Sequence, residues 1–168
     1  YSLKRVSLTL IFSVFAALLF SQSFVEQTIP VLTGISNGST TWGDYDNDGD
    51  QDVVMTRPGK LYAYRNDGDS FTDIINNSYG YSTNGSACWG DYDNDGFIDI
   101  LFTSFGTAAE IFKNNNGKSF TALDDGSFKF TMLQDLKWCD YDNDSDIDLL
   151  IYKSGENLKL CKNNLYMK

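Results

Sequence analysis

The sequence contains no histidine, the residue that most often serves as a general base or as a transition-metal ligand in proteins. Ser-His and Cys-His catalytic pairs are therefore excluded within these 168 residues. Cysteine is scarce too, with Cys88, Cys139 and Cys161 as the only three. Two of them could form a disulfide in an exported chain, but we favour three buried free thiols. Without histidine or clustered thiols, zinc and copper are poor candidates for a bound metal.

Basic residues are also few: the chain has 13, against 23 acidic residues, and a formal net charge of −10. No basic stripe offsets this charge, so we expect no binding to nucleic acid or to anionic lipid. Hydrophobic residues make up 42% of the chain and aromatic residues 15%, which is enough to bury a core and argues against general disorder. Glutamate occurs only at Glu26, Glu110 and Glu156, so aspartate supplies almost all of the acidity.

Long apolar runs are absent except at the start, where residues 6–20 follow the basic pair Lys4 and Arg5. This run is short for a membrane span, which needs about 20 apolar residues. Small residues suited to a cleavage site follow at Ser21 and Ser23. We therefore predict a secretory signal peptide over residues 1–23, with an uncleaved membrane anchor as the alternative. The prediction implies a secreted, periplasmic or cell-surface protein with no membrane span after cleavage.

Internal repetition organises the rest of the chain. Three similar segments begin 47 and 49 residues apart, at Trp42, Trp89 and Trp138. A phenylalanine precedes each tryptophan by 18 residues, at Phe24, Phe71 and Phe120. We therefore divide the chain into three repeats: 24–70, 71–119 and 120–168.

Each repeat has the pattern of several short β-strands. An apolar run typical of a strand covered on both faces lies at 53–55, 100–102 and 149–151. Alternating segments follow at 61–64 and 110–112, and asparagine-glycine turns separate the segments. About four strands in a unit of about 48 residues are typical of a propeller blade. We predict an all-β fold of three propeller-type blades with about four antiparallel strands each.

Each repeat also carries the aspartate pattern D-x-D-x-D-[GS]-x-x-D. The aspartates are Asp44, Asp46, Asp48 and Asp52; Asp91, Asp93, Asp95 and Asp99; and Asp140, Asp142, Asp144 and Asp148. The backbone carbonyl at position seven offers a further ligand, at Asp50, Phe97 and Asp146. Calcium takes 6–8 oxygen ligands at about 2.3–2.6 Å with flexible geometry, whereas magnesium demands a stricter octahedron. We predict up to three Ca²⁺ sites.

Electrostatic repulsion supports a bound cation. Two carboxylates about 4 Å apart repel by roughly 4 kcal/mol at an effective dielectric constant of 20. A solvated acidic turn is the alternative for a single loop, but three copies in the same register disfavour it. An EF-hand is excluded, because it needs a glutamate at position twelve, where this chain has Met55, Phe102 and Ile151.

The motif W-G-D-Y-D-N-D-G-x-x-D-[VIL]-[VIL], with [RK]-N-[DN] about 12–15 residues after its last aspartate, resembles the FG-GAP/VCBS repeats of integrin-α-like propellers and of many exported bacterial proteins. The resemblance implies that the loop links the first two strands of a blade and that calcium clamps this hairpin. It also implies an extracellular protein or glycan ligand, bound by a non-enzymatic adhesion or binding module. The alternative is the propeller part of a larger exported hydrolase or lyase, whose catalytic residues would lie beyond Lys168.

The chain departs from this pattern at a few positions. Ser145 replaces a glycine at loop position six, where positive φ is expected at a cost of about 1 kcal/mol, so we predict that the third site binds most weakly. Cys139 replaces the glycine after tryptophan. A propeller usually has 4–8 blades, so three repeats predict a partial propeller, completed by further blades or by self-assembly. We expect the repeated tryptophans and tyrosines to pack between blades rather than to stack on sugars.

Overall fold

The computed structural model describes residues 23–32, 38–58, 60–75, 85–104, 108–123, 135–153 and 155–164. Within these ranges the chain forms eleven β-strands and no α-helix, which confirms the predicted all-β class. The predicted signal peptide falls almost wholly on residues outside these ranges. Among the described residues, no helix has the length and apolar character needed to span a bilayer.

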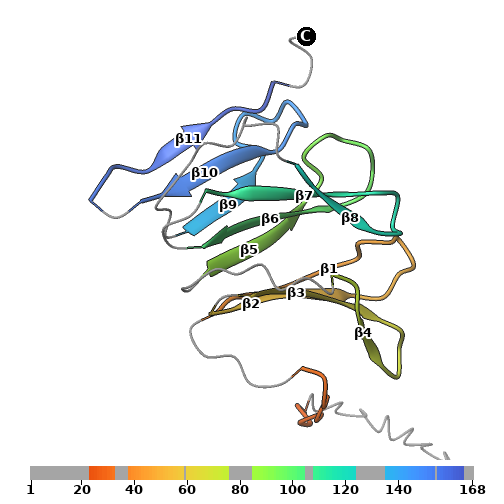
Figure 1. Ribbon diagram of the computed structural model, residues 1–168. Coiled ribbons are helices and arrows are strands. Elements are labelled where there is room, and N and C mark those ends of the chain that lie inside the picture. The colour runs from red at the N-terminus through yellow and green to blue at the C-terminus, as the bar shows by residue number, and fades with distance from the viewer. Residues whose placement is uncertain are drawn as a thin grey trace, which may run out of the picture.

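The strands form three antiparallel sheets that lie one above another (Figure 1). The first sheet contains β1 (Thr40–Gly43), β2 (Asp52–Arg57), β3 (Lys60–Asn66) and β4 (Phe71–Asp73), in that order. The second contains β5 (Gly85–Gly90), β6 (Asp99–Ser104), β7 (Glu110–Asn114) and β8 (Phe120–Leu123). In the third, β10 (Asp148–Tyr152) lies between β9 (Asp135–Cys139) and β11 (Lys159–Cys161). Propeller-type blades were predicted, and the sheets have that form.

The core lies between the sheets, because successive residues of a strand point to opposite faces. In β6, Ile100 and Phe102 pack toward the first sheet, against Val54 and Leu61. Leu101, between them in sequence, packs toward the third sheet against Leu136 and other residues. The central sheet is therefore covered on both faces, as its uninterrupted apolar run predicted.

The stack of sheets is open at its far end. Leu160 of β11 is 45% exposed, and Leu158, just before this strand, is 64% exposed. Ala63 in the first sheet and Ile111 in the second occupy the strand positions equivalent to Leu160. Both are buried against the following sheet. Among the described residues, the three sheets do not close into a ring, which agrees with a partial propeller.

The sheets and the sequence repeats begin and end at different residues. Phe71 begins β4, which pairs with β3, and Phe120 begins β8, which pairs with β7. Each of these phenylalanines therefore opens the last strand of one sheet, not the first strand of the next. The limits 24–70, 71–119 and 120–168 remain a prediction about the period of the sequence.

The repeated glycine after tryptophan lets neighbouring sheets approach closely. A Cβ placed on Gly43 would lie 2.8 Å from Cδ1 of Trp89, and one on Gly90 would lie 2.4 Å from Cδ1 of Trp138. Each glycine therefore receives the tryptophan of the following repeat. Cys139 stands at the same position in the third sheet and carries a side chain there.

Aromatic packing between the first and second sheets is confirmed. Tyr45 is buried and stacks on Trp89, with ring centroids 6.3 Å apart and an interplanar angle of 12°. At the two ends of the stack, Trp42 is 55% exposed and Tyr141 is 49% exposed.

All three cysteines are free thiols in the structure. Cys88 is buried in the core between the second and third sheets, and this desolvation raises the pKa of its thiol to about 11. Cys161 packs against the same core, and both it and Cys139 are partly exposed. The free thiols favoured from the sequence agree with this arrangement, but their predicted burial is correct only for Cys88 and wrong for Cys139 and Cys161.

Candidate metal centres

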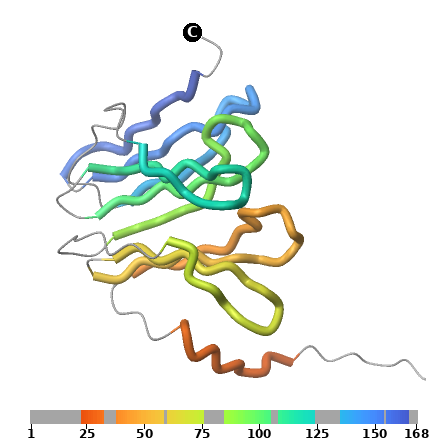
Figure 2. The backbone as a smooth tube through the Cα atoms, turned by 45° about the vertical axis from the view of Figure 1, so that its right-hand side comes forward, coloured from red at the N-terminus to blue at the C-terminus, as the bar shows by residue number. Residues whose placement is uncertain are grey.

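Each aspartate-rich segment is a loop that joins the first two strands of its sheet: β1 to β2, β5 to β6, and β9 to β10. The three loops lie along the same edge of the stack (Figure 2). This is the position that the family resemblance implied.

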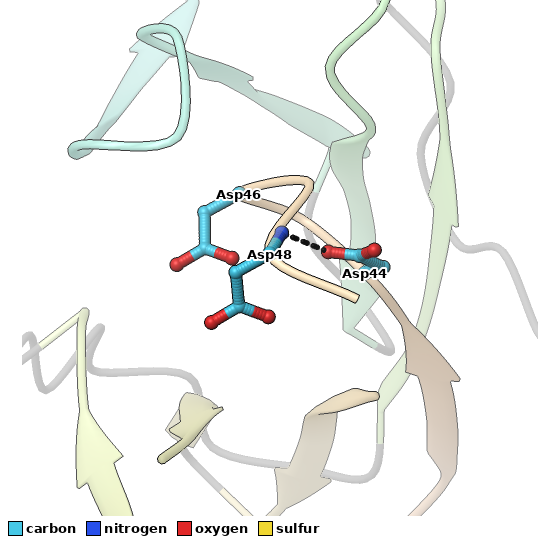
Figure 3. A group of neighbouring side chains, drawn as sticks. All are labelled: Asp44, Asp46 and Asp48. Atoms are coloured by element: carbon cyan, nitrogen blue, oxygen red, sulfur yellow. Dashed lines mark hydrogen bonds between the residues drawn. The ribbon is translucent and has the colours of Figure 1, made fainter. Parts of the chain in front are cut away.

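The loops fold through hydrogen bonds from their own backbone. In the first loop, the two carboxylate oxygens of Asp44 accept the N–H groups of Asp48 and Gly49, both at 3.1 Å. Asp48 in turn accepts the N–H of Asp50 at 2.9 Å. The same bonds recur in the second and third loops at 2.8–3.2 Å. Figure 3 shows the resulting turn, with Asp44, Asp46 and Asp48 on one short loop.

Two positions of each loop adopt the left-handed backbone conformation. Position four is asparagine in all three loops, with φ of 60° at Asn47, 56° at Asn94 and 60° at Asn143. Position six is glycine in the first two loops, whereas the third has Ser145 with φ 75°. The positive φ predicted for Ser145 is therefore present. The predicted weakness of the third site remains a prediction.

The structure brings three carboxylates together in every loop. In each group, one oxygen from each residue lies within 4.8 Å of the others. The groups are Asp44, Asp46 and Asp48; Asp91, Asp93 and Asp99; and Asp140, Asp142 and Asp148. Asp52, Asp95 and Asp144 were also predicted as ligands, but they are not members of these groups; Asp95 and Asp144 lie in the loops, and Asp52 begins β2.

The chemistry of these groups fits a hard divalent cation such as Ca²⁺. Asp46 Oδ1 and Asp93 Oδ1 are buried and have no hydrogen-bond partner among the described residues. A buried, unpaired carboxylate oxygen is costly unless a donor or a cation satisfies it. The groups offer oxygen alone, which is the ligand type that calcium prefers.

Several carboxylates of the loops have a raised pKa. Burial, followed by the neighbouring charge of Asp48, raises the pKa of Asp46. Burial also raises the pKa of Asp52, and it raises the pKa of Asp99 to about 7 despite two backbone hydrogen bonds that act in the opposite direction. Burial is the largest cause of all three shifts, and a bound cation would stabilise the ionised form of these carboxylates.

Two lysines reach into the loops from the third strand of a sheet or just beyond it. The Lys113 ammonium pairs with Asp93 and with Asp95, the latter at 3.1 Å. The Lys162 ammonium pairs with Asp142 and with Asp144, the latter at 2.8 Å. Hydrogen bonds from Lys162 lower the pKa of Asp144. Arg65 stands at the equivalent position of the first sheet, but its guanidinium pairs with Asp67 at 2.7 Å.

Sequence reasoning recorded these basic residues as part of the [RK]-N-[DN] motif without giving them a role. The asparagine of the same motif has a role too, because its backbone N–H donates to the ninth aspartate of its loop. The distances are 2.8 Å from Asn66 to Asp52, 2.7 Å from Asn114 to Asp99, and 2.8 Å from Asn163 to Asp148. The ninth aspartate thus ties the loop to the end of the third strand.

Comparison with known proteins gives the family and the fold. Among solved structures, a lectin of Agrocybe aegerita, described as specifically recognising non-reducing terminal N-acetylglucosamine, matches with a TM-score of 0.52 and 17% sequence identity. The match covers 79% of this chain and 40% of the lectin chain, so this chain spans less than half of the lectin's length. A search of curated proteins finds no match. A sequence model described as "FG-GAP-like repeat" matches residues 44–102 and again residues 91–151. Together these matches span more than half of the sequence, and the chain therefore belongs to the family of FG-GAP-like repeat proteins.

Proposed function

We propose that this chain is a calcium-binding repeat module that holds one Ca²⁺ in each of its three aspartate loops. The observation that carries the proposal is the pair of buried carboxylate oxygens, on Asp46 and Asp93, that lack a hydrogen-bond partner among the described residues. Both residues belong to three-carboxylate groups. Calcium would supply the missing positive charge and tie the two ends of each hairpin loop together.

The proposed ligands are the side chains and backbone carbonyls predicted from the sequence. In the first two loops they are Asp44, Asp46, Asp48, the Asp50 carbonyl and Asp52; and Asp91, Asp93, Asp95, the Phe97 carbonyl and Asp99. In the third loop they are Asp140, Asp142, Asp144, the Asp146 carbonyl and Asp148. Lys113 and Lys162 would have to move from their aspartates as calcium enters.

Calcium would act mainly on stability. With about 1 mM calcium and a dissociation constant of about 0.1 mM, typical of extracellular modules, each site contributes roughly 1.4 kcal/mol to the free energy of unfolding. Three sites would contribute about 4 kcal/mol out of a typical 5–15 kcal/mol. For a chain of this size, that corresponds to a rise in melting temperature of about 8–16 °C.

Thermal melts in 1 mM calcium chloride and in excess chelator test the proposal. We expect Asp46→Asn, Asp93→Asn and Asp142→Asn each to reduce the calcium-dependent rise in melting temperature by about a third. Asp69→Asn is the matched control, because Asp69 is an exposed aspartate in the β3–β4 turn, outside all three loops. Identical melting temperatures with calcium and with chelator would refute a structural role for the ion.

We also propose that the module works outside the cell and binds a protein or a glycan there. The similar fold of a lectin that recognises terminal N-acetylglucosamine makes that sugar the first probe. On a glycan array, we expect calcium-loaded protein to bind. Binding to extracellular proteins alone would argue against the glycan.

A further inference from the structure

We infer that the three calcium sites are coupled, so that calcium in one loop raises the calcium affinity of the adjacent loop. The inference rests on the proposed function, because it requires calcium in each loop. It is carried by hydrogen bonds that join each loop to the next through asparagine side chains.

The first set of links comes from position four of the loops. The Asn47 amide donates to the carbonyl of Gly96 in the second loop at 3.0 Å. The Asn94 amide donates to the carbonyl of Ser145 in the third loop at 3.3 Å, and to the Asp146 carboxylate at 2.7 Å. Asparagine at this position is not a proposed ligand, yet its side chain contacts the neighbouring loop in both cases.

The second set of links runs in the opposite direction along the stack. Asn114 donates its backbone N–H to Asp99, a proposed ligand of the second site, and its side-chain amide to the Tyr45 carbonyl in the first loop at 2.8 Å. Asn163 does the same one sheet later, binding Asp148 through its backbone and the Tyr92 carbonyl through its side chain at 2.9 Å. One residue thus touches two adjacent sites.

Backbone bonds within the loops make these links continuous. The N–H of the tyrosine at position two donates to the ninth aspartate of its own loop: Tyr45 to Asp52 at 3.0 Å, Tyr92 to Asp99 at 3.0 Å, and Tyr141 to Asp148 at 3.1 Å. The row of hydrogen-bonded residues therefore runs from Asp52 to Asp148 and passes through a proposed ligand of every site. All three ninth aspartates are fully buried, so water does not compete for these bonds.

The turn after β7 adds a packing contact between the first two repeats. A Cβ placed on Gly117 would lie 2.9 Å from Cα of Asp46, so the turn rests directly on the backbone of the first loop. Asn114 also accepts the N–H of Gly117 at 2.7 Å, which holds the turn in this position.

These contacts give a physical route for coupling. Calcium fixes the conformation of its loop, and the fixed loop holds the hydrogen-bond partners of the next loop in place. The next loop then loses less conformational entropy when it binds calcium, which makes the second binding event tighter. The effect is reciprocal, and coupling between sites is commonly about 5-fold to 150-fold in affinity.

A double-mutant cycle on the full chain tests the inference, with calcium alone as the titrant and a chromophoric chelator as competitor. Asn47→Gly with Asn94→Gly removes both amides and keeps positive φ accessible. In the wild-type background, we expect at least about a fivefold rise in the free calcium needed for half-saturation. In the background of Asp93→Asn, which disables the middle site, the same pair of substitutions should have little effect.

Asn143→Gly is the matched control. It is the same change at the same loop position, but the Asn143 amide makes no hydrogen bond to a neighbouring loop among the described residues. We expect its free calcium at half-saturation to match that of the wild type. Thermal melts in chelator test whether each variant folds. Suppose that all three sites bind calcium, but the paired substitution changes the free calcium at half-saturation less than twofold, or equally in both backgrounds. Either result would overturn the coupling and leave the proposed function standing. No calcium uptake by the wild type would overturn both.

Discussion

Adding one methyl group at Gly90 should destabilise the contact between the second and third sheets. Gly90 ends β5, and a Cβ there would lie 2.4 Å from Cδ1 of Trp138 and 2.8 Å from Cδ1 of Ile147. Carbon atoms in optimal contact are about 3.5–4.0 Å apart, so both side chains would have to move. Both belong to the third repeat, so the methyl group acts as a wedge between the sheets.

The size of the effect follows from overpacking. Inserting a methyl group into a well-packed core typically costs about 1–3 kcal/mol. For a chain of 168 residues, each kcal/mol corresponds to about 2–4 °C in melting temperature. We therefore expect Gly90→Ala to melt about 2–12 °C lower than the wild type in saturating calcium.

Cys139→Ala provides the control, because Cys139 occupies the equivalent position on the third sheet and already carries a side chain there. No following sheet covers this position among the described residues, so we expect a change within about 0.5 kcal/mol. Thermal melts followed by tryptophan fluorescence measure both variants. Equal melting temperatures for Gly90→Ala and Cys139→Ala would refute the proposed packing between repeats.

Three further predictions concern the loops. Lys113→Met should raise calcium affinity at the second site about fivefold and destabilise the calcium-free protein, because it removes an ammonium that pairs with two aspartates. Competition titrations measure the affinity. Arg65→Met is the control, because the Arg65 guanidinium pairs with an aspartate outside the loop. Ser145→Gly should relieve about 1 kcal/mol of backbone strain and tighten the third site about fivefold, as calorimetry can measure. The pKa of Asp99 is raised to about 7, so this group is mostly protonated at pH 6 and ionised at pH 8 in the calcium-free protein. Calcium requires the ionised form, so the affinity of the second site should fall about tenfold from pH 8 to pH 6, with proton release detected by titrations in buffers of different ionisation enthalpy.

The local structure of this chain was predictable because it is encoded over short distances. The apolar runs after each loop became β2, β6 and β10; β2 and β6 are covered on both faces as predicted, whereas Leu150 of β10 is only half-buried at the open end of the stack. The alternating aspartates became tight loops whose carboxylates converge, because neighbouring oxygens and N–H groups in a turn leave few other arrangements. The positive φ of Ser145 followed from the glycine at the same position in the other two loops.

Contacts between repeats were less accessible to sequence reasoning. The strand that begins at Phe71 pairs with β3, and nothing within the strand itself determines which neighbour it joins. The cost of a side chain in place of Gly90 depends on Trp138, which lies 48 residues further along the chain. The bridging role of Asn114 likewise depends on Tyr45, far away in sequence and adjacent in space. The motif marked these residues as repeated without showing what they contact.

Isothermal titration of calcium into demetallated protein tests the central claim most directly. If the aspartate loops are calcium sites, binding heat should appear with a stoichiometry near three, and the triple variant Asp46→Asn, Asp93→Asn and Asp142→Asn should give little or none. A wild-type protein that takes up no calcium at millimolar concentration would contradict the account.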